Sequence, residues 1–152
     1  MYMANRMGSL YEYDPGLTKT IRREDFTHNV YSMNEDSEGN LWLGMRGTGL
    51  RIGADKWYKN NSKDPNSLSN DQVFSIYRDR KGRMWLGTFG GGLNLAVKTK
   101  DGYQFRHFLQ DNYGEKRIRV IEEDKNGRMW VGTNNGIYIF HPDSLIASPE
   151  NY

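Results

Sequence analysis

The chain has 152 residues, of which only 36% are hydrophobic while 13% are aromatic, so a few large rings must supply much of its core. Lys and Arg number 21 against 19 Asp and Glu, and this balance gives no reason to expect nucleic acid or an anionic membrane surface as a partner. Cysteine is absent, which excludes disulfides and thiol chemistry. The sequence shows no signal peptide and no apolar run of the ~18–20 residues that a membrane span requires.

A 16-residue pattern occurs three times, at residues 30–45, 73–88 and 118–133. Its tryptophans stand 43 and 45 positions apart. A period of ~40–50 residues is typical of β-propeller blades with four short strands each. Solenoids of helix pairs share that period, but the 17 glycines exclude long helices. The sequence therefore predicts an all-β chain made of propeller blades of four antiparallel strands.

Each copy is predicted to form two strands joined by an Asp-x-x-Gly turn. Asp accepts backbone N–H bonds at the start of such a turn, and Gly adopts the left-handed conformation at its end. The second strand carries a Trp between apolar neighbours, and successive side chains point to opposite faces. We therefore expect the three repeat tryptophans to be buried between blades and Trp57, on an outer strand, to be more exposed. The residues with these structural roles are Trp42, Trp85, Trp130, Asp36, Asp79, Asp124, Gly39, Gly82 and Gly127.

In chain order the repeats divide the chain into four units. The first is a partial blade with a third and a fourth strand, two whole blades follow, and the chain end cuts the last blade. With a period of about 44 residues this makes about 3.5 blades, an incomplete ring unless self-association or a partner chain completes it. Both ends look like those of an excerpt. The units are residues 1–29, 30–72, 73–117 and 118–152.

The pattern Val-x-Ser-Ile-x-x-Asp-x-x-Gly-x-Met-Trp-Leu-Gly-Thr, followed by Gly-Gly-Leu, resembles the two-component regulator propeller repeat. Residues 64–69, Asp-Pro-Asn-Ser-Leu-Ser, are similar to a linker that this family often carries between blades. The resemblance covers residues 8–145. It implies the periplasmic sensor region of a bacterial hybrid two-component sensor kinase, a class often linked to polysaccharide use, and hence a periplasmic location.

No residues stand out as catalytic. His28, His107 and His141 lack the spacing of metal ligands, so neither a metal nor a cofactor is expected. Asp36, Asp79 and Asp124 recur in every copy at a hairpin. A structural role therefore fits these carboxylates better than the acid pair of a glycosidase.

Function is expected where the copies differ. In a propeller, the loops between second and third strands share one face with the loops that join successive blades. The latter include His28, Asn29, Asn70, Asp71 and residues 115–117. Aromatic rings stack on the C–H faces of sugars, and polar groups bind their hydroxyls. The candidate ligand-binding residues, from the first loop set and from the starts of the innermost strands, are Arg46, Phe89, Asn134, Tyr31, Phe74 and Arg119.

The sequence thus favours a ligand-sensing or binding propeller segment of a signal-transduction receptor. An oligosaccharide is the expected ligand, without catalysis by the segment itself. One alternative is a structural or protein-interaction propeller that binds no small ligand. A propeller glycosidase or lyase is the weakest alternative, because no pair of catalytic acids or bases stands apart from the repeats.

Overall fold

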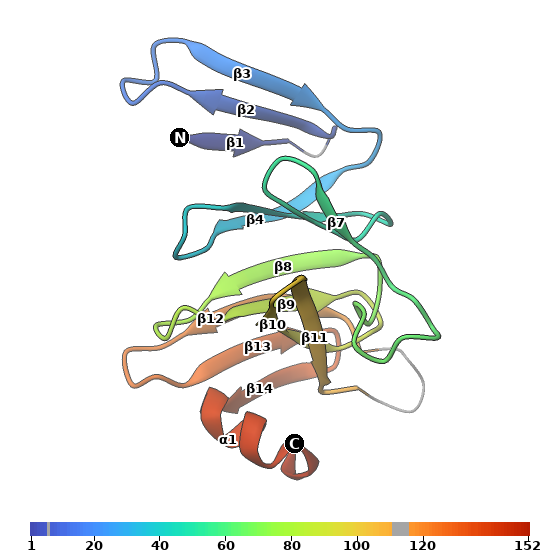
Figure 1. Cartoon of the computed structure of the whole chain (residues 1–152). Helices are drawn as coiled ribbons and strands as arrows, with labels where there is room; N and C mark the ends of the chain where they lie inside the picture. Colours follow the sequence, from blue (N-terminus) through green and yellow to red (C-terminus); the bar gives the residue numbers. More distant parts are fainter. Residues whose placement is uncertain (6, 111–115) are drawn as a thin grey trace.

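The computed structural model describes residues 1–5, 7–110 and 116–152, which form four antiparallel sheets (Figure 1). The first sheet contains β1 (Tyr2–Ala4), β2 (Ser9–Tyr13) and β3 (Thr20–Asp25). The second contains β4 (Val30–Glu35), β5 (Leu41–Met45), β6 (Leu50–Ile52) and β7 (Lys56–Tyr58). The third contains β8 (Val73–Arg78), β9 (Met84–Thr88), β10 (Leu93–Thr99) and β11 (Gly102–Phe108). The last contains β12 (Ile118–Glu123), β13 (Met129–Thr133) and β14 (Gly136–Phe140), followed by α1 (Pro142–Ala147) and the 3-10 turn η1 (Pro149–Asn151).

The sheets follow one another as successive blades and do not close a ring (Figure 1). This agrees with the predicted all-β architecture of about 3.5 blades. Two elements were not predicted: β1 pairs with β2 and gives the first sheet a further strand, and α1 follows β14. Helix α1 buries Leu145 completely in the core between the last two sheets. A short helix thus packs on the last blade after its third strand.

The hydrophobic core lies between the sheets. Trp42 is fully buried against the third sheet, where it joins Val73, Ile76 and Leu86 in one cluster. Trp85 is equally buried against the last sheet, among Ile118, Ile121 and other apolar side chains. Both tryptophans match the prediction of burial between blades.

Trp130 does not follow the prediction, since it is 37% exposed. It lies on the face of β13 that corresponds to the faces of Trp42 and Trp85, but no further described sheet covers this face. The burial of a repeat tryptophan is supplied by the following blade and not by its own. Trp57, on the outer strand β7, is 43% exposed, as expected.

Two glycines of the repeat allow the blades to approach each other. A Cβ atom at Gly44 would lie 2.7 Å from the carbonyl oxygen of Val73, the first residue of the next innermost strand. A Cβ atom at Gly87 would overlap with the side chain of Ile118, the equivalent residue one blade further on. The glycine in apolar-Trp-apolar-Gly is therefore required by blade-to-blade packing, and not by its own backbone conformation.

The first sheet packs differently from the other sheets. Gly8, Gly49 and Gly92 occupy equivalent positions, because each approaches the backbone at the neighbouring outer strand. The residues five positions before them are Met3, Gly44 and Gly87, respectively. A methionine thus stands where the other blades need glycine for contact with the next blade. The first sheet turns its opposite face, which carries Leu10, toward Leu43 and Met45 of the second sheet.

Candidate functional site

The loops after the second strands are held by one recurring backbone contact. The N–H groups of Arg46, Phe89 and Asn134 donate to carbonyl oxygens of Asn29, Gln72 and Arg117 at 3.0, 3.0 and 3.2 Å. Each acceptor residue directly precedes the innermost strand of the same blade. Arg46 also bridges to Gln72, and Phe89 to Arg117, one blade further along. The loops between second and third strands and the loops that join successive blades therefore lie together at the start of the innermost strands.

A β-bulge marks the start of each innermost strand. The pairing register shifts between Val30 and Ser32, between Val73 and Ser75, and between Ile118 and Val120. The residue skipped in each ladder is Tyr31, Phe74 or Arg119. Bulges redirect a side chain out of the regular alternation and are frequent beside functional sites. Three consecutive blades thus each present one side chain from the same bulge, two of them aromatic and one an arginine.

These side chains meet in what we call the aromatic–arginine cluster: Tyr31, Phe74, Phe89, Arg117 and Arg119. The rings of Tyr31 and Phe74 are 4.3 Å apart, and Phe74 stacks on Phe89 at 4.8 Å with an angle of 24° between the rings. The Arg117 guanidinium lies 4.3 Å from the centre of the Phe89 ring. The Arg119 guanidinium lies 4.9 Å from Phe89 and 5.3 Å from Phe74. Four of the six candidate ligand-binding residues are therefore in contact across three blades.

The remaining two candidates have different surroundings. Arg46 lines a shallow groove of about 420 Å³ together with Thr27, His28, Asn29, Gly47 and Gln72. This groove adjoins the cluster, because the backbone of Gln72 bonds that of Phe89. Asn134 accepts a hydrogen bond from the Arg117 N–H at 3.1 Å through its amide oxygen, so it positions Arg117.

Sequence reasoning did not single out Arg117 and Gln72 as site residues. The available signal was their place directly before the innermost strands, at positions equivalent to Asn29. Glu115, which is predicted to lie in the same loop set, falls outside the described residues.

The repeated Asp and Trp form a separate structural hub in each of the last three blades. The indole N–H donates to the aspartate at 2.9 Å from Trp42 to Asp36, at 3.0 Å from Trp85 to Asp79 and at 3.1 Å from Trp130 to Asp124. The other carboxylate oxygen accepts backbone N–H bonds from the residues two and four positions later. Each aspartate therefore closes its hairpin and fixes the indole of the second strand.

These hydrogen bonds lower the pKa of two of the aspartates, Asp36 and Asp124. Burial pushes the pKa of Asp36 upward, but the bonds from the Trp42 indole, the Asn40 amide and nearby backbone N–H groups outweigh it, and the pKa is lowered. The Trp130 indole, together with Arg128, lowers the pKa of Asp124 far below its usual range. A general acid needs the opposite shift, so these carboxylates suit a turn and not proton donation.

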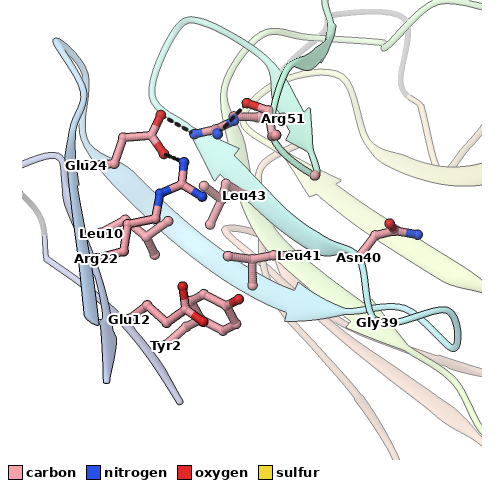
Figure 2. A pocket seen from close by; sticks show the side chains of 12 residues that line it. Tyr2, Leu10, Glu12, Arg22, Glu24, Gly39, Asn40, Leu41, Leu43 and Arg51 are labelled. Atoms are coloured by element: carbon pink, nitrogen blue, oxygen red, sulfur yellow. Dashed lines mark hydrogen bonds and ion pairs between the residues drawn. The ribbon is translucent and has the colours of Figure 1, made fainter. Parts of the chain in front are cut away.

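A partly open pocket of about 190 Å³ lies between the first and second sheets (Figure 2). Figure 2 shows Arg51 and Arg22 both directed at Glu24, and Arg51 is only 3% exposed. The Arg51 guanidinium pairs with Glu24 at 2.8 Å, donates to the Ala54 carbonyl oxygen and lies over the Phe26 ring. Opposite charges thus pair inside the pocket, which ties the differently packed first sheet to the second.

The described residues contain no group of three His, Cys, Asp or Glu side chains arranged to hold a metal ion. His107, one of the three histidines considered from the sequence, instead lies 2.7 Å from the Ser67 carbonyl oxygen. In the same part of the chain, no helix is long and apolar enough to cross a membrane.

Comparison with known proteins identifies the repeat. A family model described as two-component regulator propeller matches residues 26–47, 67–90 and 112–135, one match for each tryptophan repeat. These three repeats are two-component regulator propeller repeats. A comparison with curated protein sequences found no match.

Solved structures show the same fold for the chain that carries these two-component regulator propeller repeats. The extracellular domain of BT3049 from B. thetaiotaomicron, described as a hybrid two-component system, is 22% identical with a TM-score of 0.63, and the match covers 94% of this chain and 22% of that one. The extracellular domain of BT4673 from the same organism, described as a one-component system, is 21% identical with a TM-score of 0.55, over 91% and 26% of the two chains. The β-propeller domain of Cps50 (Swd1) from Myceliophteria thermophila is 12% identical with a TM-score of 0.66, over 94% and 48%.

The chain spans about a quarter of the length of the two B. thetaiotaomicron domains. At these identities the likeness establishes the propeller fold. The family match adds that the repeats are of the two-component regulator type.

Proposed function

We propose that the chain is a ligand-binding segment of the extracellular sensor region of a two-component system, with an oligosaccharide as ligand and no catalysis of its own. The family match and the extracellular origin of the B. thetaiotaomicron relatives support a sensor, and a periplasmic location is part of the proposal. Binding is placed at the aromatic–arginine cluster and the groove beside it.

One observation carries the proposal. The repeat keeps its framework in all three blades, yet the loop residues Arg46, Phe89 and Asn134 differ completely. The bulged residues beside them are two aromatic rings and an arginine, and these converge with Phe89 on one site. Aromatic rings, guanidinium groups and an adjoining polar groove are the components of a saccharide site. A purely structural bulge would need none of this chemistry.

The proposal is tested by calorimetry of the 152-residue chain against a panel of oligosaccharides, with turnover measured on the same panel. Binding without turnover is the expected result. Release of products from any member would instead support the glycosidase or lyase alternative. A panel without any binding would contradict the proposed function.

A protein-interaction propeller is the second candidate, and a different feature favours it. The outer face of the last sheet exposes Val120, Trp130, Ile137 and Ile139, with exposed fractions of 37–66%. Strand register places Ile139 beside Trp130, and Val120 and Ile137 beside Gly132, so these side chains form one apolar surface. Self-association or a partner chain that covers this surface belongs to this second candidate.

A further inference from the structure

We propose that the ligand of the aromatic–arginine cluster is an anionic saccharide, whose carboxylate or sulfate group is bound by Arg117 and Arg119. This inference rests on the proposed function and specifies the class of ligand for the same site. It departs from the simpler expectation that the rings themselves stack on a neutral sugar.

The aromatic faces of the cluster are already occupied. Phe74 covers one face of Phe89, so the Arg117 guanidinium, 4.3 Å from the ring centre, lies over the other. Phe74 is enclosed by the rings of Tyr31 and Phe89 and by the Arg119 guanidinium at 5.3 Å. A sugar that stacked on Phe89 or Phe74 would have to displace one of these groups.

The guanidinium groups, by contrast, keep the N–H donors along their edges for a ligand. A guanidinium that lies on a ring uses its flat face, while its N–H donors point outward in its own plane. That fork geometry matches the two oxygens of a carboxylate or sulfate group. The rings thus act as supports that hold two planar cations in place, and the cations present the donors.

The two arginines are placed to act together. Arg117 directly precedes β12, and Arg119 is the bulged residue of that strand. Their guanidinium groups share one support, since they lie 4.3 and 4.9 Å from the centre of the Phe89 ring. Both are exposed. Within the described ranges 1–5, 7–110 and 116–152, neither has an ion pair with a carboxylate.

The surrounding loops add positive charge. Arg46 is exposed in the adjoining groove, and the Lys116 ammonium lies 4.6 Å from the centre of the Tyr138 ring. The carboxylate of Asp71, in the same set of loops, accepts the Asn60 N–H at 2.6 Å. The chain as a whole is nearly neutral, so this concentration of cations is local. An anionic group is the ligand chemistry that such a site attracts.

The test uses matched saccharides that differ in charge. The 152-residue chain is titrated by calorimetry with tetragalacturonate, with the fully methyl-esterified form of the same tetrasaccharide, and with a chondroitin sulfate tetrasaccharide. Arg117→Gln and Arg119→Gln remove one guanidinium each. Arg106→Gln is the matched control, because Arg106 also lies over a ring, 5.2 Å from the centre of Phe108, but on the outer strand β11.

We expect at least one anionic probe to bind, with an affinity that falls as salt rises. The neutral ester should bind at least about tenfold more weakly, and each cluster variant should weaken anion binding by about tenfold or more, since each loses charge-assisted hydrogen bonds. The Arg106→Gln control should bind like the parent. Equal unfolding midpoints of the variants would show that the fold is intact.

Equal affinity for the acid and its ester would overturn the inference, as would anion binding that survives both cluster substitutions. In either case saccharide binding itself would still support the proposed function. If no anionic probe binds, the inference fails, and neutral members of the wider panel then decide the proposed function separately. If nothing on that panel binds, both fail.

Discussion

At the scale of single residues, each of the last three blades depends on one carboxylate that receives three kinds of donor. Asp79 accepts the Trp85 indole N–H, the backbone N–H groups of Lys81 and Arg83, and the Arg83 side chain. The same arrangement recurs around Asp36 and Asp124, with Asn40 and Arg128 in the place of Arg83. The carboxylate thereby fixes the indole in the position in which the next blade packs on Trp42 and Trp85.

The contribution of each tryptophan should depend on the blade that covers it. Trp85→Ala removes a fully buried side chain and should lower the free energy of unfolding by about 3–5 kcal/mol. Trp130→Ala is the matched control, because Trp130 makes the same bond to its aspartate but is 37% exposed, and it should cost clearly less. Denaturant unfolding of both variants measures the difference. Equal losses would contradict the account of blade packing.

Acid should weaken the fold through the same carboxylates. The folded-state pKa of Asp36 is lowered, so its contribution to stability is complete above its unfolded pKa of about 3.9 and is lost as pH falls through the folded value. We expect the unfolding midpoint in denaturant to be steady from pH 7 to 5 and to drop below about pH 4. The unfolding midpoint of Asp36→Asn should be lower than that of the parent at pH 7 and should fall less steeply as the pH drops below about 4. A variant with the parent's pH slope would rule out this linkage.

At the scale of elements, the close approach of blades at glycine predicts that Gly87→Ala destabilises the fold more than Gly132→Ala. Gly87→Ala places a Cβ atom against Ile118 of the next sheet, and we expect a loss on the order of 1–3 kcal/mol from the resulting overpacking. At Gly132 an added Cβ atom would lie 2.7 Å from Cγ1 of Val120, an exposed side chain that can rotate away. Gly132→Ala should therefore cost less in thermal or denaturant unfolding. The reverse order would show that the two glycines serve another purpose.

The strands and hairpins could be predicted from the sequence, because their signals are local: the Asp-x-x-Gly turn, the alternating pattern around Trp and the recurrence of both. Features that depend on a neighbouring blade could not be predicted in this way. Trp130 carries the same local pattern as Trp85, but its exposure is decided by the absence of a covering sheet among the described residues. Helix α1 is held by Leu145 in the core between the last two sheets and by Asp143, which pairs with Lys81 and Arg83.

The candidate site was predictable in outline. The variability of Tyr31, Phe74, Phe89 and Arg119 among otherwise similar copies identified residues that the structure brings into contact. The bulges that place three of these side chains were not predictable, because strand pairing sets the register and the sequence does not display it. The supporting role of Asn134 likewise depends on a loop contact with Arg117.

At the scale of the whole molecule, the open series of blades leaves an apolar surface on the last sheet. Such surfaces favour association. We expect the chain to associate in a concentration-dependent manner at micromolar concentration, as sedimentation or light scattering would show. Ile139→Lys introduces a charge beside Trp130 and should shift the population toward monomer. A parent chain that is monomeric under these conditions would contradict the prediction.

The central claim is that binding depends on the variable loops and bulges and not on the repeated framework. The most direct measurement is the affinity of the triple variant Arg46→Ala, Phe89→Ala and Asn134→Ala for the saccharide that the parent binds most tightly. Its control is Ser37→Ala with Lys125→Ala, in the hairpin turns at the opposite ends of the innermost strands. We predict that the triple variant keeps an unfolding midpoint close to that of the parent and loses binding, while the control retains both. A folded triple variant that binds like the parent would contradict the claim and leave these loops with a structural role alone.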